Sequence, residues 1–324
     1  MHASSPHPEA APAKTRLAPS PTGALHLGNL RTFLVNAALA RAEGWRVVMR
    51  LEDLDGPRIK CGANEQTLDV LDWLGFWWDE GPTVQSDDLA PYERAAAQLG
   101  GNKLAYPCDL TRTEIEQSHS APHRAEGTER SESVFPAHLR PELIARPFDD
   151  RETNWRFVTG EETIEFDDRF AGARSMKPSE GVGDFPIWTK RGVPSYQLAV
   201  VVDDAAQGVT HVVRGDDLLE STARQILLAR ALGLPPIREF THLPLVLGED
   251  GRRLAKRHGD TRLLTYRERG VSAERIIGLL AFWSNVTERP QAMRIDEFCE
   301  RFDLARMDPS PTVFRKEDES WLIS

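Results

Sequence analysis

The sequence predicts an α/β protein whose parallel sheet is split by an inserted segment. Strand and helix patterns alternate over 14–105 and again over 193–258, and such alternation is typical of parallel strands joined by crossover helices. Between them, residues 106–192 are rich in proline, serine, histidine and glutamate and contain only short strand-like pieces. Helical patterns fill 259–324. At 324 residues with 40% hydrophobic content, the chain is long enough to bury a sizeable core.

The first half of the α/β region contains two strands, each followed by a helix. Apolar residues at helical spacing, such as Phe33, Leu34 and Ala37, mark the first helix, and Gly44 lies where a helix ends. Gly75 stops the second helix in the same way. The predicted elements are a strand over 15–18, a turn over 19–23, a helix that opens near Asn29, a strand over 46–51 and a helix over 64–74.

The insertion and the second half are predicted from shorter signals. The run Leu198 to Val202 is a continuous apolar stretch of the kind found in buried strands. Gly233 marks the end of a helix, and after Gly259 an apolar face that includes Ile276 and Leu280 indicates further helices. The predicted elements are strands over 155–158, 163–166, 198–202, 210–213 and 243–247, and a helix over 222–232.

Nothing in the sequence points to a membrane or to secretion. It contains no run of about 18 apolar residues, and its N-terminus is neither basic nor apolar. Residues 1–13 form a tail rich in proline, alanine and serine, which we expect to be disordered. Because Cys61, Cys108 and Cys299 are widely separated, we expect no disulfide. The expected location is the cytoplasm, with no membrane partner.

The net charge of −10 argues against a general nucleic-acid binder, because phosphate contacts need a basic surface. A local basic patch is compatible with it. Arginines recur between Arg112 and Arg151, and a denser cluster of cations lies in 252–262. Because scattered charges commonly form a solvated face, we treat only the dense cluster as a candidate site.

The turn after the first strand has the features of an anion site, since a glycine-bearing turn before a helix leaves backbone N–H groups and the helix dipole facing a ligand. The ten residues P-S-P-T-G-A-L-H-L-G, at 19–28, resemble the HIGH region of class I aminoacyl-tRNA synthetases in its glutamyl and glutaminyl form. A loop histidine beside a packing glycine would explain a shorter match. The resemblance implies that His26 donates to phosphate oxygens and that Gly28 lets adenine approach the backbone. The implied ATP-binding residues of this turn are Pro19, His26, Gly28 and Asn29.

A second loop carries the dense cluster of cations. G-E-D-G-R-R-L-A-K-R-H-G-D, at 248–260, resembles the KMSKS loop of the same family, with Arg253 and Lys256 at the places of the two lysines. The resemblance implies that both bind ATP with its Mg²⁺ and that Lys256 is catalytic together with His26. Two residues depart from the family pattern, because Arg253 replaces a lysine and Ala255 replaces a serine. A basic surface loop is the alternative interpretation.

The carboxyl ends of the strands supply candidates for amino-acid binding, because open α/β sheets bind ligands there. Taken singly, each candidate could equally be a solvated acid, a strand aromatic or a surface ion-pair residue. The resemblance implies that Glu52 binds the ammonium of L-glutamate and that arginines read its side-chain carboxylate. The implied glutamate-binding residues are Arg16, Ala18, Ser20, Glu52, Tyr196 and Arg214. The sequence leaves open which arginine dominates.

The segment Y-Q-L-A-V-V-V-D-D-A-A-Q-G-V-T-H-V-V-R-G-D-D-L-L, at 196–219, is similar to the short tRNA-modifying branch of this family. The resemblance implies a class I synthetase Rossmann-like parallel sheet with an inserted α+β domain over 106–192. It also implies a helical stem-contact-like segment over 259–324, with no anticodon-binding domain. The implied reaction is tRNA-independent activation of L-glutamate with ATP, followed by transfer of glutamate to the queuosine base in the anticodon of tRNA(Asp). We expect a monomer.

Two other functions fit the same residues. A truncated glutamyl-tRNA synthetase would charge the 3′ end of a tRNA instead of a modified base. A catalytically weak paralogue would only bind tRNA, and the departures at Arg253 and Ala255 are the residues that favour it.

We do not expect structural zinc. Relatives often carry a C-x-C at the start of the insertion, whereas this chain has Cys108 followed by Leu110 at the second ligand position. His119 and His123 have the i, i+4 spacing of possible ligands but lie in a polar loop. One cysteine with flexible histidines is a poor tetrahedral site. The expected cofactors are therefore ATP and Mg²⁺.

Overall fold

The structure of the chain is a computed structural model. Most of the predicted disordered tail lies outside the residues that it describes, since description begins at Pro12. No helix within this part of the chain is long and apolar enough to cross a membrane. The described residues are 12–21, 25–56, 59–117, 134–254 and 261–324.

A parallel three-stranded sheet with the order β1–β2–β3 begins the fold, as predicted from the alternating pattern. Val48 on β2 is the register partner of Arg16 on β1, so both strands end at the same edge of the sheet. Each crossover between these strands contains a helix. The elements are β1 (Lys14–Leu17), α1 (Leu27–Glu43), β2 (Arg46–Leu51), α2 (Ala63–Trp73) and β3 (Glu80–Val84).

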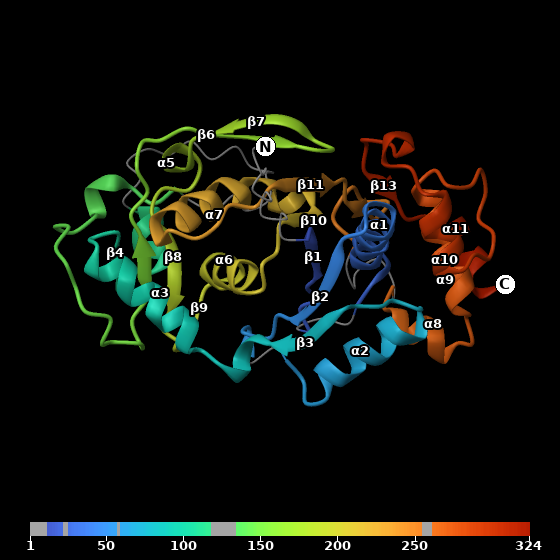
Figure 1. Ribbon diagram of the computed structural model, residues 1–324, viewed down its shortest axis with the longest axis horizontal. Helices are drawn as coiled ribbons and strands as arrows, with labels where there is room; N and C mark the ends of the chain where they lie inside the picture. The colour runs from blue at the N-terminus through green and yellow to red at the C-terminus, as the bar shows by residue number, and fades with distance from the viewer. Residues whose placement is uncertain (1–11, 22–24, 57–58, 118–133, 255–260) are drawn as a thin grey trace, which may run out of the picture.

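A second sheet, with the order β10–β11–β6–β7, continues this architecture. The Thr210 N–H donates to the Lys14 carbonyl at 2.8 Å, which places the start of β10 beside β1, as Figure 1 shows. β6 and β7 come from the segment 106–192, yet β6 pairs with β11 from the second half of the α/β region. The elements are β6 (Ile164–Asp168), β7 (Gly172–Met176), β10 (His211–Gly215), α7 (Leu219–Leu232) and β11 (Glu239–Leu243).

The rest of the segment 106–192 contributes to an antiparallel sheet of order β4–β5–β8–β9. Its aromatic side chains, including Trp155, Phe185 and Trp188, are fully buried against α3, α6 and α7. Figure 1 shows this block on the opposite side of the central strands from the C-terminal helices. The elements are α3 (Ala90–Gly101), β4 (Ala105–Pro107), α4 (Arg112–Gln117), β5 (Trp155–Phe157), α5 (Pro178–Gly181), β8 (Phe185–Thr189) and β9 (Val193–Pro194).

The predicted strand over 198–202 is wrong, because this run lies inside helix α6 (Tyr196–Ala206). A short apolar run does not distinguish a buried strand from a buried helix by periodicity. The deciding feature is Ser195, whose side chain accepts from the Leu198 N–H as an N-cap. The helix carries Asp204, a buried residue of α6, towards the central strands.

The predicted strand over 243–247 is also wrong as a single element. β11 ends at Leu243, and a separate strand β12 (Val246–Leu247) pairs with β13 (Thr312–Val313) of the C-terminal segment. The break falls at Pro244, which has no N–H to continue a ladder. The break turns Pro244 towards the edge of the sheet at which β1 and β2 also end.

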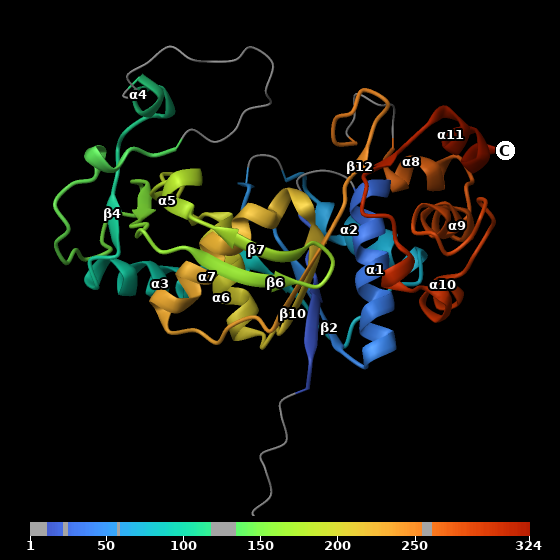
Figure 2. The same ribbon diagram turned by 90° about the horizontal axis from the view of Figure 1, so that it is seen from above.

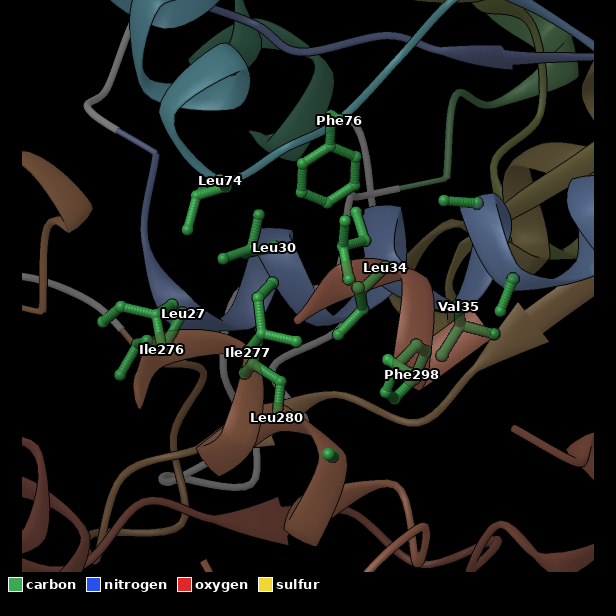
Figure 3. Close-up of a cluster of buried hydrophobic side chains, with 14 of the residues drawn as sticks. Leu27, Leu30, Leu34, Val35, Leu74, Phe76, Ile276, Ile277, Leu280 and Phe298 are labelled. Atoms are coloured by element: carbon green, nitrogen blue, oxygen red, sulfur yellow. The ribbon is translucent and has the colours of Figure 1, made fainter. Parts of the chain in front are cut away.

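Helix α1 lies between the central strands and the C-terminal helices, as Figure 2 shows. Its apolar side chains Leu27, Leu30 and Leu34 share one buried cluster with Ile277 and Leu280 (Figure 3). This packing joins the C-terminal segment to the helix that follows the first strand. The C-terminal helices are α8 (Leu263–Glu268), α9 (Ala273–Trp283), α10 (Ile295–Arg301) and α11 (Lys316–Ile323).

A substitution at Gly278 in α9 tests this C-terminal packing. A Cβ at this position would collide with the backbone carbonyl of Gln291. We expect Gly278→Ala to lower the free energy of unfolding by about 1–3 kcal/mol, measured by urea denaturation, because backbone on both sides must shift. Gly101→Ala is the control, since a Cβ there meets nothing within 4 Å. Equal effects of the two substitutions would contradict this account of α9.

Candidate active site

A cavity of about 450 Å³ lies at the carboxyl ends of β1, β2 and β10 and at the N-termini of α1 and α6. This is the edge at which parallel α/β sheets bind ligands. Every predicted ATP- or glutamate-binding residue within the described ranges lines it; Lys256 and Ala255 lie outside those ranges. The predicted residues that line the cavity are Arg16, Ala18, Pro19, Ser20, His26, Gly28, Asn29, Glu52, Tyr196, Arg214 and Arg253.

His26 caps the helix that it precedes. Its Nδ1 accepts from the Gly28 N–H at 3.1 Å, and its own N–H donates to the Asn29 side chain at 3.4 Å. Helix α1 therefore begins two residues before the predicted opening at Asn29. Because Nδ1 accepts, the neutral ring carries its proton on Nε2. His26 can thus donate a hydrogen bond to a ligand at a helix N-terminus.

The electrostatic setting keeps His26 neutral. Burial, together with the nearby charge of Arg253, lowers the pKa of His26 to about 4. Gly28 suits the same geometry, because a Cβ there would lie 3.1 Å from the His26 ring, a tight contact that would press on the ring. The glycine therefore makes room for the histidine as well as for any ligand above it.

Glu52 is oriented by a buried arginine that sequence reasoning missed. Arg50, on β2, donates to Glu52 at 3.1 Å and to Asp204 at 2.7 Å, and it lies 3.7 Å from Asp203. Burial raises the pKa of Glu52, although Arg50 and Arg16 oppose the shift. The sequence does contain a signal for this role, because Arg50 lies inside an apolar strand and a buried cation needs acidic partners.

Arg16, on β1, also contacts Asp204, the acid that pairs with Arg50. Its Nη1 donates to the Val213 carbonyl at 3.1 Å, and its Nε lies 3.6 Å from Asp204. Asp204 therefore lies between Arg16 and Arg50, and its negative charge is shared by the two guanidinium groups. The cluster of Arg16, Arg50, Glu52 and Asp204 can present one acid to an ammonium group.

Arg214 differs from these arginines, because its hydrogen-bond acceptors are uncharged groups. Its Nη1 donates to Gln225 at 2.8 Å, and its Nη2 donates to Thr222 at 2.8 Å and to the Leu218 carbonyl at 3.4 Å. Its Nε donates to His242 at 3.0 Å. Burial lowers the pKa of Arg214. A buried cation with neutral partners is costly, and a carboxylate entering the cavity would compensate its charge.

Tyr196 and Arg253 complete the described wall of the cavity. Tyr196 is the first residue of α6 and is 38% exposed, whereas Leu198 and Ala199 in the same turn are buried. Arg253 forms an ion pair with Asp217, which also lines the cavity. Arg253, the residue of the KMSKS-like loop that lines the described cavity, is therefore held by an acid that follows β10.

Cys108 lies away from this cavity. It is buried in a small cluster with Tyr106, Ile115 and Phe135. The alternative ligands His119 and His123 lie outside the described residues. Across the ranges that the structure covers, no three histidine, cysteine or acidic side chains gather as a metal-binding group.

Comparison with known proteins identifies the family to which this chain is similar. The profile described as "tRNA synthetases class I (E and Q), catalytic domain" matches residues 12–321. The chain is 44% identical to the glutamyl-Q tRNA(Asp) synthetase of Symbiobacterium thermophilum, covering 91% of this chain and 94% of the relative. It is also 44% identical to the protein of that name from Rhodopirellula baltica, covering 93% and 96%.

A solved structure supports the fold. The crystal structure of a glutamate tRNA ligase from Elizabethkingia meningosepticum, in complex with its amino acid, matches with a TM-score of 0.74 and 28% identity. The match covers 96% of this chain and 68% of that protein. The predicted class I synthetase Rossmann-like fold is confirmed.

Proposed function

Because the chain belongs to the class I tRNA synthetases of the glutamate and glutamine type, we propose that it is an ATP-dependent ligase that activates L-glutamate without tRNA. The observation that carries the choice of amino acid is Arg214, a buried cation whose hydrogen-bond acceptors are neutral. Transfer of glutamate to the queuosine base of tRNA(Asp) is supported by the two near-full-length relatives named for that acceptor.

In the proposed reaction, an oxygen of the α-carboxylate of glutamate attacks the α-phosphorus of ATP. The bond to the β-phosphate breaks, which yields glutamyl-adenylate and pyrophosphate. ATP enters as its Mg²⁺ complex. The chain offers no nucleophile in this scheme; it accelerates the step by holding the reactants in line and by stabilising charge on the phosphates.

Each predicted site residue then has a proposed task, including Lys256, which lies outside the described residues. Glu52, oriented by Arg50, binds the ammonium. Arg214 binds the side-chain carboxylate, with Arg16, Tyr196, Ser20 and the backbone at Ala18 completing that subsite; these four residues line the cavity with Arg214. His26 donates from Nε2 to a phosphate oxygen, and Pro19, Gly28 and Asn29 shape the nucleotide site. Arg253 and Lys256 neutralise the departing pyrophosphate.

The helical segment 259–324 is proposed to contact RNA, while 14–105 and 193–258 carry the residues that are proposed to bind ATP and glutamate. We further propose that the protein acts as a monomer in the cytoplasm, where ATP, glutamate and tRNA meet. A glutamyl-tRNA synthetase that charges the 3′ end is the alternative supported by the structural match.

The two acceptors are separated by locating the transferred glutamate. We expect labelled glutamate to enter tRNA(Asp) that contains queuosine and not the same tRNA without it. The label should be recovered in the anticodon fragment after nuclease digestion. Removal of the 3′-terminal adenosine is the control, and it should leave incorporation unchanged. Incorporation that is independent of queuosine and lost with the 3′ adenosine would establish the alternative.

ATP–pyrophosphate exchange tests the first half of the reaction. With glutamate alone, the chain should catalyse exchange, and tRNA should not be required. Exchange that needs tRNA would contradict tRNA-independent activation. No exchange under any condition would identify the chain as a weak, tRNA-binding paralogue.

A further inference from the structure

A buried chain of hydrogen bonds reaches Arg214 from the segment 106–192. Asp168, the last residue of β6, lies 2.6 Å from Nδ1 of His242 on β11, and both side chains have no solvent exposure. Nε2 of His242 accepts from Arg214 at 3.0 Å. Figure 2 shows the β6–β7 hairpin running from the inserted block towards β10, the strand that carries Arg214.

The hydrogen bonds determine the protonation state of His242. The Nε–H of Arg214 can only donate, so Nε2 of His242 must accept and carries no proton. The proton of the neutral ring is therefore on Nδ1, where it is donated to Asp168. Burial also lowers the pKa of His242, which keeps the ring from becoming a second cation beside Arg214.

Backbone N–H groups, in addition to His242, stabilise the ionised form of Asp168. Its carboxylate accepts from the backbone N–H of Phe170 at 3.0 Å, of Ala171 at 2.7 Å and of His242 at 3.1 Å. Although burial alone would raise it, the pKa of Asp168 is lowered, because hydrogen bonds from His242 and Ala171 favour the ionised form. An ionised Asp168 accepts the Nδ1 proton and so enforces a single tautomer of His242.

We propose that Asp168 and His242 are positioning residues for amino-acid recognition, which fix the orientation of Arg214 for the side-chain carboxylate of glutamate. This rests on the proposed function of Arg214. Asp168 supplies the tautomer, His242 supplies the acceptor for Nε, and Thr222 and Gln225 hold the two terminal nitrogens. The segment 106–192 thereby contributes to amino-acid selection through the β6–β7 hairpin.

Asp168→Asn tests the tautomer with little change in shape. The amide can donate to Nδ1 of His242, which would move the ring proton to Nε2. Two N–H donors, Nε2–H of His242 and Nε–H of Arg214, would then face each other and their hydrogen bond would be lost. We expect the KM for glutamate in ATP–pyrophosphate exchange to rise about tenfold or more, because a hydrogen bond to a charged group is lost. The KM for ATP should not change. Asp167→Asn, at the exposed neighbouring position on β6, is the matched control and should behave as the wild type.

The two substitutions His242→Gln and His242→Asn test independently whether Arg214 needs a hydrogen-bond acceptor at the place of Nε2. In His242→Gln the side-chain oxygen reaches the place of Nε2 and can accept from Arg214, so the KM for glutamate should stay close to that of the wild type. In His242→Asn the amide reaches only the place of Nδ1, and the KM for glutamate should rise as in Asp168→Asn. This pair decides the question if Asp168→Asn does not fold.

Three results would overturn the proposal: an unchanged KM for glutamate in Asp168→Asn, equal increases in the KM values for glutamate and ATP, or equal effects of His242→Gln and His242→Asn. The wild-type exchange reaction is the reference for all of them. If the wild type shows no exchange with glutamate, the proposed function fails. If it does and the variants do not differ from it, only the positioning role fails.

Discussion

Arg214→Met should reduce kcat/KM for glutamate on the order of a thousandfold, because a buried carboxylate would lose its charged partner. The KM for ATP should stay unchanged, since Arg214 is proposed to bind glutamate and not the nucleotide. The measurement is ATP–pyrophosphate exchange over a range of glutamate concentrations. A reduction of less than about tenfold would assign recognition of the side-chain carboxylate to Arg16 instead.

Thermal unfolding separates loss of recognition from loss of structure. Arg214→Met removes a buried charge, which relieves a desolvation penalty, but it also leaves the buried acceptors on His242, Gln225 and Thr222 without their donor. These two effects on the free energy of unfolding oppose each other in the substrate-free protein. We expect the Arg214→Met midpoint to match that of the wild type without glutamate and to lose the upward shift that glutamate causes. Arg230→Met is the control, because Arg230 lies on α7 and is exposed.

His26→Asn should lower kcat of the exchange reaction by about a hundredfold to a thousandfold, the loss typical of removing one donor to a developing charge. Asparagine keeps the helix cap, because its side-chain oxygen can accept from the Gly28 N–H in place of Nδ1. The variant lacks the Nε2 donor. His26→Ala should lose the same activity and, in addition, about 1 kcal/mol of unfolding free energy with the cap.

The difference between the two substitutions is the decisive measurement. If His26→Asn retained wild-type kcat while His26→Ala lost it, the histidine would act only as a cap. The pH dependence is a second check. Because the pKa of His26 is lowered to about 4, the ring is neutral near neutral pH, and His26 should cause no fall in kcat until the pH approaches that value.

The local elements of this protein were predictable because their signals lie within a few residues. Strand β2 and helices α1, α2 and α7 follow from apolar spacing and from glycines at their ends. The apolar run of helix α6 is too short to show a period, and for that reason the sequence predicts a strand there. The sequence predicts that α1 opens later than it does, because histidine is not among the residues that are expected as N-caps.

The residue types of the candidate site were also visible in the sequence. The HIGH-like and KMSKS-like segments and the acids and arginines at strand ends predicted that ATP and glutamate meet at one edge of the sheet. The structure places the described members of that set around one cavity. Their individual roles stay predictions that the exchange experiments test.

The sequence by itself determined the fold class and the chemistry that the strand ends can offer. Only the tertiary structure decided which charges are paired: Arg50 with Asp204 across 154 positions, and Asp168 with His242 across 74. The physical reason is that pairing and desolvation depend on which elements meet in space, whereas motifs record only what lies next along the chain. For that reason Arg214 is distinguished from Arg16 and Arg50 by its neutral partners, and not by its position in a motif.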